Sequence, residues 1–158
     1  MSVNHKIFIA ESESDFRNAK EMVLAYAEFL NADLSFQNFE GELKSFNIMY
    51  SSPKGSMLLA ENSGNVVGAV GLRYLSEGVA EMKRMFVLPK FQGHGIGDAL
   101  MSAFIKQACK LGYSSIKLDT IPELDKAIRL YKKHNFVQIK AYRYNPHPGV
   151  QYYELKIS

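Results

Sequence analysis

The sequence contains a single cysteine, Cys109, and no tryptophan. One cysteine cannot form a disulfide within the chain and cannot build a cysteine-only zinc site. No apolar stretch approaches the roughly 18 residues that cross a membrane, and the first residues lack the basic and apolar regions of a signal peptide. These absences predict a protein of the reducing cytoplasm that does not bind a membrane.

The net charge is also small, at +3 for 158 residues. This small surplus suits an anionic cofactor, but without a run of Lys or Arg it gives no reason to expect nucleic acid. A content of 47% hydrophobic and 22% charged residues is typical of a globular protein, and the length predicts one domain over residues 1–158. The histidines lack the spacing of a metal site, so we expect no bound metal; they are His5, His94, His134 and His147.

Hydrophobic periodicity predicts helices at 12–30, about 36–45 or on to 50, 96–111 and 123–134. It predicts strands at 7–9, 57–61, 66–74, 79–88, 115–119, 136–140 and 150–157. Turn residues between 57 and 88 predict an antiparallel meander. The helix that separates strands 79–88 and 115–119 predicts that these two are parallel. The expected fold class is therefore α/β (α+β), with a mixed, mostly antiparallel central sheet flanked by helices.

The most informative segment is MFVLPKFQGHGIG, residues 85–97. It combines a buried strand, a proline stop, a glycine-rich loop and the start of a helix. A helix start has free backbone N–H groups and the positive end of the helix dipole, so it favours anions. The glycines at 93, 95 and 97 lack the Cβ atoms that would keep a phosphate away from those groups. The segment predicts a site for a phosphate or pyrophosphate carried on a larger cofactor.

Other interpretations of this loop match less well. Residues 93–98, GHGIGD, are close to the dinucleotide fingerprint G-x-G-x-x-G, and Asp119 follows about 20 residues later, where an acid would bind the ribose. The third glycine is one position early, however, and the loop follows an antiparallel meander. The loop also lacks the Gly-Lys-Ser/Thr of a P-loop, which argues against ATP or GTP. The plainest alternative is that the glycines only form a tight turn.

Gln92, Gly95 and Gly97 have the spacing Gln-x-x-Gly-x-Gly and follow a strand and a proline. They resemble the acyl-CoA signature of the GNAT N-acetyltransferase superfamily. Residues 127–136, AIRLYKKHNF, resemble its A-x-x-L-Y-x-x-x-G-F segment, with Asn135 in place of the usual glycine. The order of the elements agrees, so the resemblance covers nearly the whole chain. Further pieces resemble a bacterial subgroup of this superfamily without an assigned substrate: EMKRMFV at 81–87, LDTIP at 118–122 and NPHPG at 145–149.

The resemblance implies the GNAT fold, with acetyl-CoA bound where two parallel strands splay apart at a bulge. Main-chain N–H groups of residues 93–97 would hold the pyrophosphate, and the N–H of Phe86 or Val87 would polarise the thioester carbonyl. The residues that it assigns to the cofactor are Met85, Phe86, Val87, Gln92, Gly93, His94, Gly95, Ile96, Gly97, Ala127 and Tyr131.

The resemblance also implies direct transfer of the acetyl group to a primary amine in a ternary complex. Tyr131 is the candidate acid. Because the ordinary pKa is about 10 for tyrosine and about 8.5 for a thiol, we expect Tyr131 to donate a hydrogen bond to the departing thiolate rather than its proton. Glu81 is the candidate base for the amine, directly or through a chain of water. The alternative function is a sensor that binds acyl-CoA without catalysis.

The acceptor has no signature in the sequence. A small metabolite, a polyamine, an antibiotic and a protein terminus all stay open, as does a homodimer. We expect the loop at 142–149 to shape the acceptor site; its candidates are Tyr142, Tyr144, Asn145 and His147. Three carboxylates of the early segment suit either a cationic acceptor or a solvated face; they are Asp33, Glu40 and Glu42.

Overall fold

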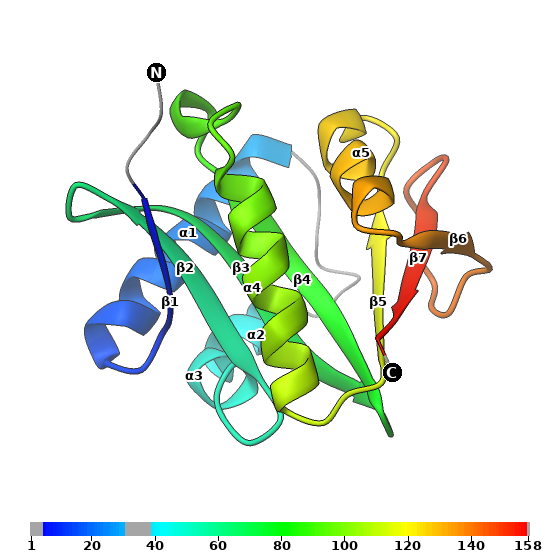
Figure 1. The fold of residues 1–158 in the computed structure, drawn as a ribbon, viewed down its shortest axis with the longest axis horizontal. Helices are drawn as coiled ribbons and strands as arrows, with labels where there is room; N and C mark the ends of the chain where they lie inside the picture. Colours follow the sequence, from blue (N-terminus) through cyan, green and yellow to red (C-terminus); the bar gives the residue numbers. More distant parts are fainter. Residues whose placement is uncertain (1–4, 31–38, 158) are drawn as a thin grey trace.

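The computed structural model describes residues 5–30 and 39–157, in which seven strands form one sheet (Figure 1). The strands are β1 (Lys6–Ile9), β2 (Ser56–Asn62), β3 (Asn65–Ser76), β4 (Val79–Val87), β5 (Ser115–Thr120), β6 (Val137–Ile139) and β7 (Gln151–Lys156). Their order across the sheet is β1-β2-β3-β4-β5-β7-β6. Every neighbouring pair is antiparallel except β4 and β5. The predicted mixed, mostly antiparallel sheet is confirmed.

The helices cover both faces of this sheet. They are α1 (Glu13–Leu30), α2 (Phe39–Lys44), α3 (Phe46–Met49), α4 (Ile96–Lys110) and α5 (Asp125–Lys133). Figure 1 shows α4 across one face and α1 to α3 behind the sheet. The predicted second helix is in fact two short ones, because Ser45 has a ψ of 13° and interrupts the helical backbone. Residues 36–38 of that prediction lie outside the described residues. Among the described helices, none combines the length and the hydrophobicity needed to cross a bilayer.

Helix α1 begins where the sequence predicts, at a reciprocal pair of cap hydrogen bonds. The Asp15 N–H donates to Ser12 Oγ over 3.0 Å, and the Ser12 N–H donates to Asp15 Oδ2 over 3.2 Å. Each side chain thus accepts from a backbone donor that has no partner within the helix. This cap fixes the start of the helix whose apolar face covers β3 and β4.

Two apolar cores lie on opposite faces of the sheet. The core under α4 includes Leu100, Phe104 and Ile116, and the core under α1 and α3 includes Phe46 and Tyr50, all at most 2% exposed. Burying one such side chain contributes roughly 1.5–3 kcal/mol. Strand β4 contributes Ala80 and Met82 to the core under α4 and Phe86 to the core under α1, so its two faces have separate surroundings.

Candidate active site

Strands β4 and β5 pair only near their starts. Val79, Ala80 and Glu81 face residues 115–117, and no register partner on β5 follows, although β4 continues to Val87. Figure 1 shows the two strands diverging toward their C-terminal ends. Beyond Glu81, the edge of β4 that faces β5 therefore has no strand partner among the described residues. An extended ligand can pair with such an edge as an added strand does.

A bulge in β4 coincides with this separation. Ala69 on β3 pairs with Phe86 and Gly71 pairs with Lys83, so that one residue of β3 faces two of β4. The inserted residue is Arg84, whose φ is +58°. A bulge twists a strand and changes the direction of the backbone that follows it. The bulge that the resemblance implies is confirmed.

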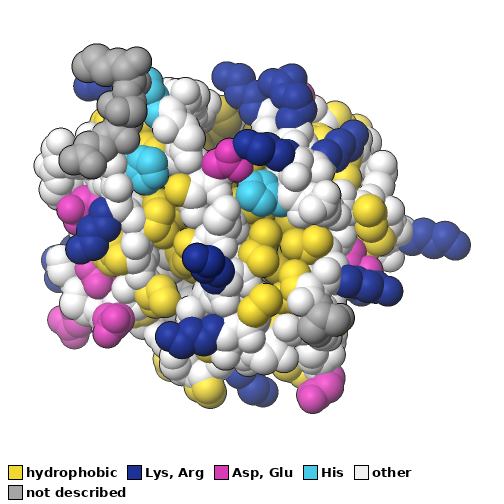
Figure 2. All heavy atoms as spheres, viewed as in Figure 1, with side chains coloured by type: hydrophobic (Ala, Val, Ile, Leu, Met, Phe, Trp, Pro, Cys, Tyr) yellow, Lys and Arg dark blue, Asp and Glu magenta, His cyan; other side chains and the backbone are white. Residues whose placement is uncertain are grey.

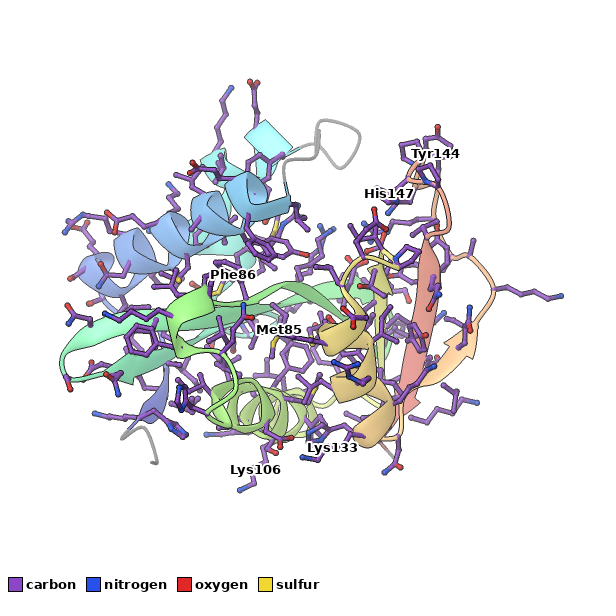
Figure 3. All side chains as sticks on the ribbon, turned by 90° about the horizontal axis from the view of Figure 1, so that it is seen from above. Met85, Phe86, Lys106, Lys133, Tyr144 and His147 are labelled. Carbon is purple, nitrogen blue, oxygen red and sulfur yellow. The ribbon has the colours of Figure 1, made fainter. Side chains whose placement is uncertain are left out.

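The backbone direction after the bulge follows from one hydrogen bond. The Leu88 N–H donates to the Val67 carbonyl on the β3 side over 2.9 Å. Because main-chain groups of an extended strand alternate between its two edges, the N–H groups of Met85 and Val87 face the β5 side and that of Phe86 faces β3. The Phe86 side chain packs on the α1 face and Met85 on the α4 face (Figure 3).

The loop after β4 presents open main-chain amides. A 3-10 turn, η2 (Pro89–Phe91), leads to Gly93 and Gly95, whose φ angles are +82° and +84°. A Cβ built on either glycine would meet no atom within 4 Å. Among the described residues, the amides of 93–98 donate no backbone hydrogen bond, and Gly95 caps α4 without a side-chain bond. Positive φ demands glycine here, and the open space over free amides fits a phosphate.

Gln92 and Gly97 have structural surroundings of their own. The Gln92 side chain donates from Nε2 to the Val87 carbonyl over 2.8 Å, which fastens the loop to the end of β4. A Cβ on Gly97 would lie 3.5 Å from Leu130 and 3.9 Å from Met85. Gly97 thus faces α5 and β4 rather than the open space over Gly93 and Gly95.

The first turn of α4 carries a carboxylate whose charge is compensated. Asp98 forms an ion pair with Lys133, and His134 Nε2 lies 2.7 Å from its Oδ1. The hydrogen bond from Lys133, and then the one from His134, lower the pKa of Asp98. These contacts join α4 to the end of α5, where Asn135, in place of the usual glycine, has a φ of +72°, a conformation that asparagine can adopt after a helix. Figure 2 shows that Lys and Arg are dispersed over this face rather than gathered in a strip.

Tyr131 lies on α5 and is buried against aromatic rings. Its ring centroid is 5.9 Å from that of Phe136 and 6.3 Å from that of Tyr153. Burial first, and then the charges of Tyr26 and Asp119, raise the pKa of Tyr131 far above its ordinary value of 10. The phenol therefore keeps its proton and can donate a hydrogen bond.

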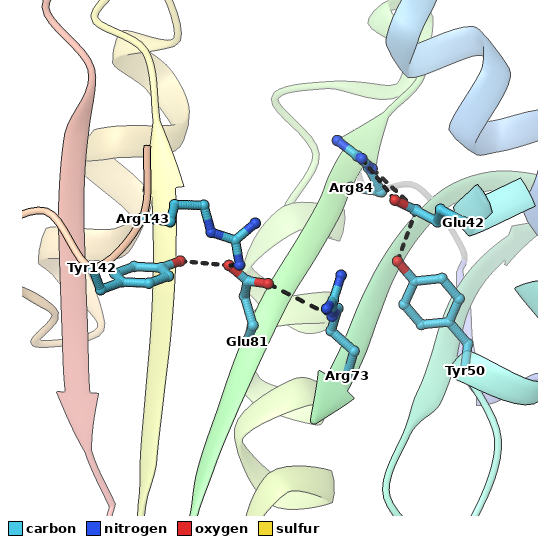
Figure 4. Close-up of polar contacts among 7 residues, drawn as sticks. All are labelled: Glu42, Tyr50, Arg73, Glu81, Arg84, Tyr142 and Arg143. Carbon is cyan, nitrogen blue, oxygen red and sulfur yellow. Dashed lines mark hydrogen bonds and ion pairs between the residues drawn. The ribbon is translucent and has the colours of Figure 1, made fainter. Parts of the chain in front are cut away.

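Glu81 lies on β4, fully buried among cationic and phenolic groups (Figure 4). Tyr142 donates to its Oε2 over 2.6 Å, and Arg143 forms an ion pair with the same oxygen. Arg73 Nε lies 3.7 Å from Oε1, which accepts no hydrogen bond from the described residues. Burial, and then the charge of Glu81, raise the pKa of Tyr142 well above its ordinary value.

The comparisons with known proteins agree with this geometry. The Acetyltransferase (GNAT) family matches residues 21–136. The chain belongs to this family. It is 36% identical over 157 residues to an uncharacterized N-acetyltransferase of Schizosaccharomyces pombe. The alignment covers 98% of this chain and 96% of that protein. It is 29% identical over 113 residues to the uncharacterized N-acetyltransferase YjgM of Escherichia coli, over 70% of this chain and 68% of that one.

Solved structures share the fold. A GNAT acetyltransferase of Staphylococcus aureus superposes with a TM-score of 0.81 at 21% identity, covering 98% of this chain and all of that one. The protein yncA of Salmonella typhimurium, solved with its cofactor acetyl-CoA, has a TM-score of 0.68 at 16% identity over 98% and 94% of the two chains. The protein is thus an N-acetyltransferase that takes acetyl-CoA as cosubstrate and transfers its acetyl group to an acceptor.

In this acetyltransferase the bulge residue Arg84 is held by a buried ion pair. Its Nη2 lies 2.7 Å from Glu42 Oε1 and its Nε 3.2 Å from Oε2, while Tyr50 donates to the same carboxylate over 2.9 Å. Burial alone would raise the pKa of Glu42, but the hydrogen bonds and charge of Arg84 outweigh it and lower the pKa. Glu42 therefore anchors the bulge. Glu40 is exposed, and Asp33 lies outside the described residues.

Replacing Glu42 with glutamine is expected to lower the free energy of unfolding at pH 7 by about 2 kcal/mol, because Arg84 stays buried without its counter-charge. Since the folded-state pKa of Glu42 is depressed, its stabilisation is present above the ordinary value of 4.5 and is lost as pH falls through the folded value. Urea unfolding at pH 7 and pH 3 measures both effects. Glu40→Gln, on an exposed residue, is the control; equal losses in the two variants would contradict the assignment.

The structure also places residues near Glu81 that the motifs did not indicate. Arg73 and Arg143 flank Glu81, and Lys83 is 4% exposed on the same face. Asp119, at the end of β5, accepts from Asn145 Nδ2 over 3.1 Å. Its charge contributes to the raised pKa of Tyr131 and of other groups, which places it near the separated strands. The signal available in the sequence was the pair of charged residues at 81 and 83 inside a buried strand.

Two of the acceptor candidates in the 142–149 loop lie apart from this cluster. Tyr144 is 76% exposed, and His147 Nε2 lies 3.0 Å from Glu123 Oε2. Figure 3 shows both at the outer end of the molecule, away from Met85 and Phe86. Tyr142 and Asn145 instead contact Glu81 and Asp119.

Proposed function

We propose that this acetyltransferase acts as one domain over residues 1–158 and transfers the acetyl group directly to a primary amine while both substrates are bound. The observation that carries the proposal is the unpaired edge of β4, which ends at a loop of open amides. The lone cysteine supports a cytoplasmic location.

The test incubates the protein with acetyl-CoA and each amine of a panel and measures the release of free thiol. Intersecting initial-rate patterns are expected, because direct transfer needs both substrates together. Parallel patterns would indicate an acetyl-enzyme intermediate instead. Tight binding of CoA with no thiol release on any amine would favour the sensor.

The loop and β4 hold the cosubstrate in this proposal. Acetyl-CoA supplies the thioester, and the amides of residues 93–97 bind its pyrophosphate, with Ile96 at the helix start and His94 on the exposed side. The outward N–H groups of Met85 and Val87 pair with the pantetheine arm and polarise the thioester carbonyl. Ala127, half-buried on α5, packs against the core beside this arm.

Tyr131 donates a hydrogen bond to the departing thiolate. Its buried position keeps the proton on the phenol, since the raised pKa makes proton transfer to sulfur still less favourable than in water. A charged acceptor strengthens such a bond relative to a neutral one.

Glu81 takes up the proton of the amine through water. Phe86 lies five positions after Glu81, about 16 Å in an extended strand, which is too far for direct contact with an amine at the thioester. Its Oε1 has no donor among the described residues and can accept from a water molecule. Arg73 and Arg143 hold the carboxylate in place.

Replacing Glu81 with glutamine is expected to lower the turnover number about tenfold at pH 7, less than the 10²–10⁴-fold typical of a directly contacting base, because bulk water can still accept the proton. The loss should shrink as pH rises toward the pKa of the amine. The pH dependence of thiol release measures this. Tyr142→Phe, which removes only the hydrogen bond to Glu81, should give a smaller loss. A loss that is the same at every pH would exclude the base role.

A further inference from the structure

Cationic side chains outnumber carboxylates where β4 and β5 separate, on the sheet face opposite α4. Arg84 is matched by Glu42, while Arg73 and Arg143 share the single carboxylate of Glu81. Buried charges are costly unless they are compensated. Among the described residues, these contacts and the charges that act on Lys83 involve four cations, Arg73, Lys83, Arg84 and Arg143, and three carboxylates, Glu42, Glu81 and Asp119. Lys117 and Glu154, register partners on β5 and β7, add one charge of each sign.

The pKa of Lys83 reflects its burial and the positive charges around it. It is 4% exposed, and its pKa is lowered to about 8, first by burial and then by the charge of Arg84. Arg143 adds to this effect, whereas Glu81 and Asp119 oppose it. A ligand that brings a negative charge between Lys83 and Arg143 would be attracted, and a second positive charge would be repelled.

Arg143 has a donor left for such a ligand. Its Nη2 contacts Glu81, but its Nε is buried and has no hydrogen-bond partner among the described residues. The guanidinium is a planar fork that matches a carboxylate with two parallel N–H groups. An unpaired buried donor costs stability, and a carboxylate ligand would remove that cost. Arg143 is partly exposed and follows Tyr142 in the segment between β6 and β7.

Asp119 supplies the opposite charge close by. Its carboxylate acts on the pKa of Lys83 and Arg143 and also on that of Tyr131, which lies on the thioester side. An ammonium group beside Asp119, which Asn145 contacts from the same loop as Arg143, is therefore within electrostatic reach of both the cationic pair and the proposed thiolate donor. In a free amino acid the amine and the carboxylate are separated by one carbon, and that spacing suits neighbouring sites of opposite sign.

We propose that the acceptor is a small amine that carries its own carboxylate, as a free amino acid does. Its carboxylate binds Arg143 and Lys83, and its amine lies at Asp119, facing the thioester. This inference rests on the proposed function and names the substrate class of the same site. It excludes polyamines and other purely cationic amines as the preferred acceptors.

The experiment compares each of several amino acids (glycine, alanine, aspartate and glutamate) with its amide, its decarboxylated amine and spermidine. The amide has the less basic amine, so a larger fraction of it is neutral, and without carboxylate recognition it should be the better acceptor. We expect kcat/KM to be at least about 100-fold higher for the preferred amino acid than for its amide. Amides or spermidine used as well as the amino acids would overturn the inference while leaving the acetyltransferase function intact.

The variant Arg143→Gln separates recognition from a structural role, because the readout is the ratio of kcat/KM for the acid to that for its amide. This ratio should fall about 30-fold, with the KM for acetyl-CoA unchanged. Lys140→Gln, on an exposed cation near the same segment, should leave it unchanged. An unchanged ratio in Arg143→Gln would contradict the carboxylate site.

A binding measurement covers the case in which no amine is acetylated. N-acetyl amino acids should then raise the melting temperature of the CoA complex, and their amides should not. Absence of thiol release overturns the proposed function, whereas absence of this thermal shift overturns the inference.

Discussion

Replacing Gly95 with valine is expected to weaken acetyl-CoA binding about a thousandfold, which corresponds to about 4 kcal/mol. Gly95 has a φ of +84°, and a β-branched residue is strongly disfavoured there. The new side chain would also occupy the open space above the amides of residues 93–98. Titration calorimetry with acetyl-CoA measures the affinity directly.

Gly112→Val is the matched control at the opposite end of α4. Gly112 has a φ of +92°, and a Cβ there also meets nothing within 4 Å. Both variants should therefore lose about 1–2 kcal/mol of stability from the left-handed backbone, but only Gly95→Val should lose the ligand. Equal affinities in the two variants would show that the loop does not carry the phosphate site.

Replacing Tyr131 with phenylalanine is expected to lower kcat about 100-fold, because a hydrogen bond to a charged group contributes roughly 1.5–3 kcal/mol. The ring contacts with Phe136 and Tyr153 remain, so stability and the KM for acetyl-CoA should change little. Pre-steady-state thiol release isolates the chemical step. The pH profile of the wild type should show no limb from Tyr131, since its pKa lies far above the working range.

Tyr153→Phe controls for the loss of a buried phenol in the same ring cluster. Its hydroxyl donates to Gln151 over 2.6 Å and has no place in the proposed chemistry. A wild-type kcat in Tyr131→Phe, or an equal loss in Tyr153→Phe, would remove Tyr131 from the mechanism.

Local signals in the sequence predicted the elements well. The Ser12 and Asp15 cap, the turn glycines and the alternation along the strands act over a few residues, so they are visible in the chain itself. The helix between strands 79–88 and 115–119 was enough to predict their parallel pairing. The helix predicted at 36–45 is confirmed over 39–44, and only its extension to 50 is interrupted, at Ser45, where the backbone leaves the helical conformation.

The polar cluster around Glu81 could not be predicted in the same way. Arg73 and Arg143 are 70 positions apart in the sequence. Both contact Glu81 only because β3 and the segment after β6 flank β4 on one face. Gln92 illustrates a related limit: its motif indicated the cofactor, and the hydrogen bond from its side chain to the Val87 carbonyl is visible only in the fold. Whether a polar group serves the backbone or the ligand depends on tertiary neighbours.

A crystal structure of the acetyl-CoA complex tests the central claim most directly. The account predicts pyrophosphate oxygens within about 3 Å of main-chain nitrogens between Gly93 and Gly97, with the pantetheine arm along the outward edge of Met85 and Val87. A complex in which the pyrophosphate lies on side chains elsewhere, with that edge of β4 uncontacted, would contradict it.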